Sequence, residues 1–296
     1  MKVEIKSILA VLVMVSTVCS NAKVQKASKA KGIPQKLQKG ALWQIDLGDE
    51  VVMELVPIEA GSFLMGSEDG ADDERPVHRV TFSNSFWLAK TETTQLQYCQ
   101  IMDCDSSEFR DDNHPVRLSW YDAMEFCKKL TTQERLTGHL PEGYEYTLPT
   151  EAQWEYACRA GISEKYCYGG EVDSLDDFAN YKGSPRYGRK KKMAPAGKHL
   201  PNAWGLYDMH GNVWEWCLNC DGAYPFEKII THDNIHCGCR RIMRGGGYLG
   251  SSEDCRSANR ARFYPIVSAA GFRVCLVRKV DTLPKKSSAV EKGSIP

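Results

Sequence analysis

The sequence predicts a single domain of mixed α/β class in which much of the chain is irregular loop. Two stretches rich in valine and phenylalanine, 51–63 and 77–88, indicate strands. Three other segments begin with a hydroxyl residue that is followed three positions later by a polar side chain, as at a helix start. Beyond residue 166 glycine and proline are frequent and no second hydrophobic core is evident, so we expect few long elements.

The first 22 residues have the pattern of a signal peptide. Two lysines precede an apolar run, 8–18, and Ser20-Asn21-Ala22 has the small-x-small form of a signal-peptidase site. Acylation of Cys19 in a lipoprotein is a less favoured alternative, because the residues before it fit a lipobox poorly. The sequence therefore predicts export to the periplasm or the extracellular space.

The remaining chain divides into three parts. A lysine-rich stretch, 23–45, is expected to be a solvated linker, the domain occupies 46–280, and 281–296 is a polar tail expected to be disordered. The formal net charge is zero, so composition gives no indication of a nucleic-acid partner. No segment after the signal peptide is long and apolar enough to form a transmembrane helix.

The three helix starts can be assigned to particular residue pairs. These are Thr94 with Gln97, Ser119 with Asp122, and Thr150 with Gln153. In the second helix apolar residues recur at helical spacing and should face the core: Trp120, Ala123, Met124, Cys127 and Leu130. Gly161 is expected to end the third helix.

The segment 205–216 must turn sharply and still be buried. Gly211 and Asn212 can adopt positive φ angles, while three aromatic side chains bring large apolar areas. Glu215 lies between two tryptophans, and a buried carboxylate requires a partner. An arginine is favoured for this partner over a hard cation such as calcium.

The segment from Asn202 to Trp216 closely resembles a motif of the formylglycine-generating enzyme family, also called sulfatase-modifying factors. Four further motifs match in order: Met53–Ser67, Asp73–His78, Thr150–Ala157, and Arg244–Gly247 with Gly271–Arg273. Together the motifs cover about residues 50–278. The resemblance implies a fold akin to C-type lectin domains, in which long loops are held on a small amount of sheet. It also implies an activity, the oxidation of a peptidyl cysteine in sulfatases.

The resemblance places the catalytic question in the segment 244–262. In the enzymes that it resembles, two cysteines five residues apart bind one copper(I) ion, which is soft and needs both thiolates. Here Cys255 stands at the second position and Gly250 at the first, while Gly247 replaces a serine of the family. The copper site is therefore not expected to form, and Cys255 is a catalytic candidate only if it acts alone or with another partner.

Two other metals follow from the resemblance. A structural calcium ion would be held at the turn by Gly211, Val213 and Glu215. A related branch, the sulfoxide synthases, uses non-haem iron held by histidines in an additional helical domain, to which this sequence has no counterpart. The seven histidines show no facial-triad arrangement, so iron is not favoured.

The sequence contains twelve cysteines, one of which, Cys19, would leave with the signal peptide. In an exported protein most of the other eleven are expected in disulfides, with at least one unpaired because their number is odd. Cys99 with Cys104 and Cys158 with Cys167 are plausible local pairs.

A second group of cysteines has the spacing of metal ligands. Two residues separate Cys217 from Cys220 and one separates Cys237 from Cys239, with two histidines nearby. Outside the cytoplasm oxidation competes with zinc binding. Disulfides are therefore favoured in this segment, with a structural zinc site second.

Polar residues after the glycine-rich motif are candidates to line a ligand groove: Glu253, Asp254, Arg256 and Asn259. Arginine forks suit carboxylate or phosphate groups, although ion pairs within the loops are the alternative explanation. The preferred hypothesis is an exported binding or accessory module without the copper oxidase site, with a protein or peptide partner in the envelope. A cysteine oxidase acting on sulfatases is the alternative, and a non-haem iron oxidase the second alternative.

Overall fold

The computed structural model describes residues 40–104, 113–169, 172–184, 192–224 and 239–279. The expected signal peptide and tail, most of the expected linker, Cys19 and Cys237 lie outside the described residues. Within the described ranges no helix is both long and apolar enough to cross a membrane.

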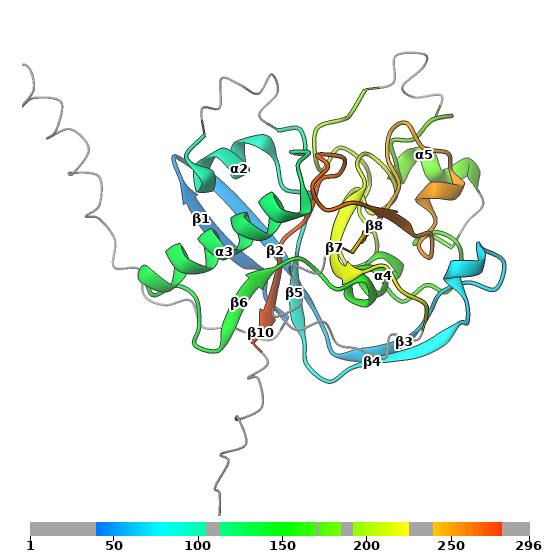
Figure 1. Cartoon of the computed structure of the whole chain (residues 1–296), viewed down its shortest axis with the longest axis horizontal. Helices are drawn as coiled ribbons and strands as arrows, with labels where there is room; N and C mark the ends of the chain where they lie inside the picture. The colour runs from blue at the N-terminus through cyan, green and yellow to red at the C-terminus, as the bar shows by residue number, and fades with distance from the viewer. Residues whose placement is uncertain (1–39, 105–112, 170–171, 185–191, 225–238, 280–296) are drawn as a thin grey trace, which may run out of the picture.

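A five-stranded antiparallel sheet forms one half of the domain (Figure 1). Its strands, in spatial order, are β1 (Trp43–Gly48), β2 (Val51–Ile58), β5 (Phe86–Ala89), β10 (Cys275–Arg278) and β6 (Tyr144–Thr147). Strands from the two ends of the domain therefore meet, because β10 pairs with β5 and β6. The sheet also takes in residues 43–45, which the sequence analysis assigned to the linker, and buries Trp43 and Ile45.

Two helices, α2 (Gln95–Met102) and α3 (Trp120–Leu136), cover one face of this sheet (Figure 1). The predicted stripe on α3 is confirmed, since Trp120, Ala123, Cys127 and Leu130 are buried and Met124 packs against the same core. All three predicted helix starts are confirmed, because the hydroxyl side chain accepts a hydrogen bond from the N–H three residues on.

The other half contains the remaining strand from each of the two predicted strand regions and a smaller sheet. The stretches 51–63 and 77–88 are each split, giving the hairpin of β3 (Gly61–Met65) and β4 (His78–Phe82) besides β2 and β5. Helix α4 (Glu151–Arg159) ends two residues before Gly161, and Ala160 between them adopts the left-handed conformation. The short helix α5 (Leu175–Phe178) follows.

The chain beyond residue 166 is more regular than expected. Three short strands, β7 (Glu215–Cys220), β8 (Arg241–Arg244) and β9 (Ala261–Phe263), pair in that order into an antiparallel sheet. Every residue of β8 is buried and β7 is buried on both faces, so neither strand shows the alternation that marks a half-exposed strand. This sheet contains one end of each of two family motifs, at Trp216 in β7 and at Arg244 in β8.

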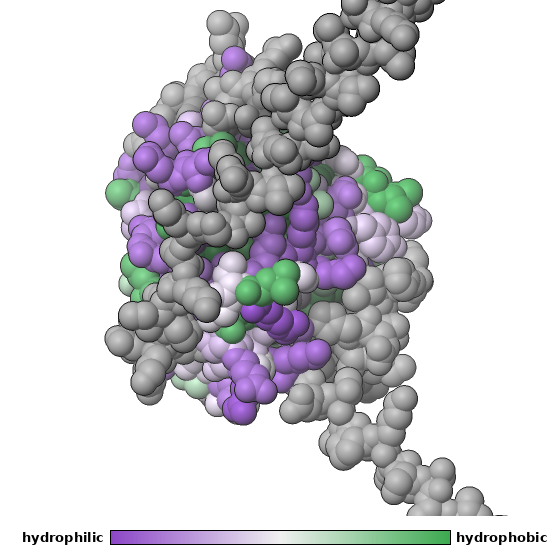
Figure 2. Space-filling model, turned by 90° about the vertical axis from the view of Figure 1, so that its left-hand side faces the viewer, coloured by the Kyte–Doolittle hydropathy of each residue, from purple (hydrophilic) through white to green (hydrophobic). Residues whose placement is uncertain are grey.

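The surface on the left of Figure 1 is predominantly polar. Figure 2 shows this face with hydrophilic residues in the majority and hydrophobic residues in small separate groups among those described. The large apolar side chains lie inside, where Trp43, Trp120, Trp154 and Trp216 are fully buried. The stability of the domain therefore rests on an aromatic-rich core that spans both halves.

Candidate functional site

The turn at Gly211 and Asn212 has the predicted geometry. Their φ angles are 121° and 62°, both in the left-handed region. A Cβ on Gly211 would lie 2.6 Å from the carbonyl oxygen of Asn180, so only glycine fits there. The Asn212 amide donates to Glu92 Oε2 (2.8 Å), and Asn212 Oδ1 accepts from Ala194 N–H (2.8 Å). The Asn212 side chain therefore holds the turn by hydrogen bonds to Glu92 and to Ala194.

Glu215 has the arginine partner that the sequence analysis favoured. Arg273 donates through Nε to Glu215 Oε2 and through Nη2 to Oε1, each at 2.6 Å. Trp154 Nε1 also donates to Oε2, at 2.7 Å. Both side chains of the ion pair are buried, so the bidentate geometry compensates the desolvation of the two charges.

A second buried ionic network joins α4 to β8. Arg244 donates to Glu151 Oε1 (2.8 Å) and to Glu155 Oε2, and none of the three side chains is exposed. Arg260 binds Glu151 through Nε (2.6 Å), while Arg159 binds Glu155 (2.8 Å). The neighbouring carboxylates raise the pKa of Arg244 against the opposing effect of burial, which is the largest single influence. These ion pairs connect α4 to β8.

The groove candidates are mostly engaged within the protein. Arg256 is buried and donates two hydrogen bonds to Glu74, at 2.9 and 2.8 Å. Its Nε lies 2.8 Å from Glu253 Oε2. Its guanidinium fork is therefore occupied, as the ion-pair explanation predicted. Asp254 accepts from Ser251, and Asn259 donates its N–H to the carbonyl of Arg256. Of the candidate residues, Glu253 alone is well exposed.

Cys255, five residues after Gly250 in the sequence, is fully buried. Its thiol contacts the carbonyl oxygen of Ser251 at 3.5 Å. Burial raises the pKa of Cys255, and the charge of Asp254 raises it further. Because the thiolate is the nucleophile and the metal ligand, this environment disfavours the reactive form of Cys255. Gly250 supplies no sulfur, so only Cys255 of these two positions carries a thiol.

The cysteines are paired less often than expected. Four of the described cysteines form the disulfides Cys99–Cys104 and Cys220–Cys239, and six are free and buried. The first bond was predicted. The predicted pair of Cys158 with Cys167 is wrong, since both are free. Buried free cysteines behave as small apolar side chains, so the core accommodates them without oxidation.

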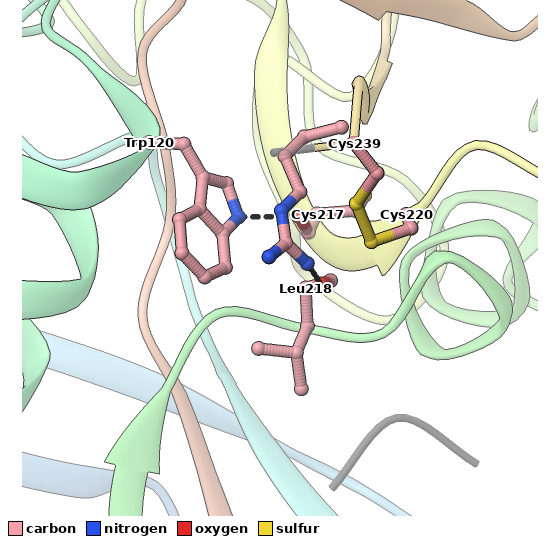
Figure 3. Close-up of a disulfide and its surroundings, with 6 residues drawn as sticks. Trp120, Cys217, Leu218, Cys220 and Cys239 are labelled. Carbon is pink, nitrogen blue, oxygen red and sulfur yellow. Dashed lines mark hydrogen bonds between the residues drawn. A yellow bond between two sulfur atoms is a disulfide. The ribbon is translucent and has the colours of Figure 1, made fainter. Parts of the chain in front are cut away.

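The second disulfide decides between the alternatives for the later cysteines. Cys220 at the end of β7 bonds to Cys239 just before β8, with Cα atoms 5.8 Å apart (Figure 3). Cys217 is a free thiol, and its carbonyl accepts from Trp120 Nε1 at 2.9 Å (Figure 3). In the part of the chain that the structure describes, no group of three or more potential ligands is placed to hold a metal ion. Disulfide formation is thus confirmed over zinc at Cys220 and Cys239, whereas the expected disulfide at Cys217 is wrong.

His210 is a site residue that the sequence analysis missed. It is buried, and its Nδ1 lies 2.7 Å from the carbonyl oxygen of Cys255 while its Nε2 accepts from the N–H of Cys167 at 3.1 Å. These partners fix the neutral tautomer with the proton on Nδ1. Cys158 Sγ lies 3.7 Å from Nε2, so one imidazole joins three cysteine-containing segments. The spacing of the histidines along the sequence does not indicate this role.

Comparison with known proteins identifies similar domains. The profile of the sulfatase-modifying factor enzyme 1-like domain matches residues 48–278. Formylglycine-generating enzyme from Mus musculus is 30% identical over 290 residues, 74% of each chain. Serine/threonine-protein kinase pkn1 from Chlamydia caviae is 33% identical over 243 residues, 74% of this chain but 37% of the kinase. The chain thus spans little more than a third of that relative's length.

Chaperone protein LppX from Paenibacillus barcinonensis is 29% identical over 238 residues, 67% of this chain and 79% of that protein. Among solved structures, Treponema denticola variable protein 1 has a TM-score of 0.66 at 24% identity, covering 79% of this chain and 98% of that one. PvdO from Pseudomonas aeruginosa has a TM-score of 0.63 at 25% identity, covering 81% and 99%. These two solved structures, which carry different names, therefore share the single-domain fold.

Proposed function

Because the chain belongs to the family of sulfatase-modifying factor enzyme 1-like domains, we propose that it is a binding or accessory module of that family and not a copper oxidase. One observation carries the proposal. Gly250 stands where the resembled enzymes have the first copper-binding cysteine, and a glycine supplies no ligand. Family membership alone does not transfer an activity, because one fold supports many functions.

The environment of Cys255 supports the proposal. Its thiol is buried, and both its burial and the neighbouring Asp254 disfavour the thiolate. A catalytic cysteine requires the opposite setting, an accessible sulfur whose pKa is lowered by nearby positive charge. Gly247, at the position of the family's serine, is a second departure in the same segment.

The relatives favour different functions. The similarity to enzymes named as formylglycine-generating supports the alternative, an oxidase acting on a peptidyl cysteine of sulfatases. The similarity to a protein named as a chaperone supports an accessory role with a protein or peptide partner. We favour the accessory role because it does not depend on the missing cysteine. Export is part of the proposal, and the two disulfides accord with an oxidising compartment.

We expect the purified protein to show no copper-dependent oxidation of a Cys-x-Pro-x-Arg peptide. The reason is that one buried, protonated thiol cannot replace a pair of thiolates. The measurement is a copper(I) titration under anaerobic conditions, followed by oxygen uptake and mass spectrometry of the peptide. A family enzyme that retains both cysteines serves as the positive control. Stoichiometric copper binding with peptide oxidation would show that the oxidase alternative is correct, and copurified iron would support the iron oxidase.

Calcium binding at the turn is a further part of the proposal, with Gly211, Val213 and Glu215 as ligands. The buried charges around the turn suit a cation. Burial raises the pKa of Glu92 well above its usual value, and the negative charges of Asp208 and Glu215 raise it further. Arg273 opposes this effect. Glu215 Oε1 accepts one hydrogen bond from Arg273, so it retains a lone pair for a hard cation.

We expect calcium to raise the melting temperature of chelator-treated protein. A ligand at one hundred times its Kd adds about 2.7 kcal/mol, which corresponds to roughly 5–10 °C in a domain of this size. Differential scanning fluorimetry in calcium and in EDTA measures the change. The variant Asp69→Asn, in an exposed acidic loop, should keep the full response. Identical melting curves in calcium and in EDTA would refute a calcium site.

A further inference from the structure

Gly250 lies in a turn that holds its backbone in place but does not itself exclude a side chain. Its N–H donates to the carbonyl of Gly247 at 2.7 Å, and its carbonyl accepts from Lys182 N–H at 2.6 Å. Unlike Gly245 and Gly246, Gly250 does not have a φ angle in the left-handed region. An L-residue can therefore adopt its backbone conformation. The surroundings of the Cα atom decide whether a side chain fits.

Those surroundings are filled by the side chain of Asp254 and by the carbonyl oxygen of Gly247, which a Cβ would approach to 3.2 Å. A Cβ built on Gly250 lies 3.0 Å from Asp254 Oδ2 and 3.3 Å from Asp254 Cβ. Both distances are shorter than the 3.4–4 Å of ordinary van der Waals contact for a Cβ atom. The carboxylate is held there, because Oδ2 accepts from Ser251 N–H at 2.7 Å and from Ser251 Oγ at 2.9 Å. A side chain on residue 250 therefore requires this capped carboxylate to shift by a few tenths of an ångström.

We propose that Asp254 closes the position of the missing thiolate, so that two residues, Gly250 and Asp254, together abolish the two-sulfur site. Asp254 acts by its volume, which fills the space next to Gly250, and by its charge, which opposes a second anion there. Restoring a cysteine at residue 250 alone therefore does not restore copper(I) binding. The inference rests on the proposed loss of the oxidase site, but it concerns how the site is closed.

The test compares the parent protein with Gly250→Cys, Asp254→Ala and the double variant Gly250→Cys/Asp254→Ala. Copper(I) affinity is measured by anaerobic competition with a chromophoric chelator, and the number of sulfur ligands by X-ray absorption. The double variant is expected to bind one equivalent through two sulfurs, at least 100-fold more tightly than Gly250→Cys alone. As a control, Ser83→Cys/Asp254→Ala adds an exposed thiol in the turn between β4 and β5 and should match Asp254→Ala.

A stability measurement keeps the test informative if a cysteine variant folds poorly. Gly250→Ala adds the Cβ alone and is expected to lower the melting temperature by about 3–6 °C, but by at most half as much in the Asp254→Ala background. Equal losses in both backgrounds would refute closure by Asp254. Two-sulfur copper binding by Gly250→Cys alone would refute it as well. Copper binding by the parent protein would instead overturn the proposed function, so the two failures are distinguishable.

Discussion

The variant Glu151→Gln is expected to lower the free energy of unfolding by about 3–5 kcal/mol, the range found when one partner of a buried ion pair is removed. Glu151 is fully buried and accepts from Arg244 (2.8 Å) and from Arg260 (2.6 Å) through the same oxygen. Tyr224 donates to it as well, at 3.1 Å. A neutral amide at this position leaves two buried guanidinium groups facing each other without their shared carboxylate.

Urea unfolding followed by tryptophan fluorescence measures the loss of stability. The matched control is Glu125→Gln, which removes an exposed carboxylate from the ion pair with Lys128 on α3. Such a surface pair contributes little, so the control should stay within about 0.5 kcal/mol of the parent protein. If Glu151→Gln were as stable as the control, the network joining α4 to β8 would not hold these elements together.

The elements that the sequence predicted correctly depend on local chemistry. Thr94, Ser119 and Thr150 start their helices because a hydroxyl satisfies an N–H three residues away, and this contact is fixed by the local sequence. Gly211 and Asn212 are predictable for the same reason, since few residues tolerate positive φ.

The elements that it missed depend on tertiary contacts. Every residue of β8 is buried because β7 and β9 flank it, and no periodic pattern marks such a strand. Cysteine pairing is likewise a property of the fold. Cys158 and Cys167 are close in sequence, but both segments contact the ring of His210 and the sulfurs remain unbonded.

The candidate site likewise has one feature that the sequence reveals and others that require the structure. The missing ligand at Gly250 is visible in the sequence because the neighbouring motifs fix the register. The role of Asp254 is not visible, because it requires the turn that brings its carboxylate against the Cα atom of Gly250. Arg256 was assigned to a groove from its chemistry alone, and the structure shows its guanidinium bound to Glu74.

The buried thiols lead to the second large prediction, a steep loss of stability in alkali. Five free cysteines have pKa values raised above the usual range, with burial as the largest cause in each: Cys127, Cys158, Cys217, Cys255 and Cys275. For Cys158 burial raises the pKa to about 12. In the unfolded chain these thiols have pKa values of about 8.5. Above that pH the native state holds protons that the unfolded state loses.

The sign of the effect follows from this difference in bound protons. Stability from the thiols is complete below the unfolded pKa and falls as pH rises from about 8.5 towards the raised pKa values of the folded state. Each thiol contributes a slope that approaches about 1.4 kcal/mol per pH unit, so five remove about 6 kcal/mol between pH 8 and 9.5. This loss is comparable to the whole stability of many domains, about 5–15 kcal/mol.

We therefore expect the domain to unfold near pH 9.5–10, as the five thiols together remove most of its stability. Urea unfolding at pH 7.5, 8.5 and 9.5 gives the slope of the free energy of unfolding against pH. Oxygen is excluded so that no new disulfides form. Cys255→Ala should reduce the slope by about one fifth, because it removes one of the five protons. Ser83→Ala, at an exposed position without a thiol, should leave the slope unchanged. A free energy of unfolding that is constant across this range would mean that the thiols ionise inside the native fold.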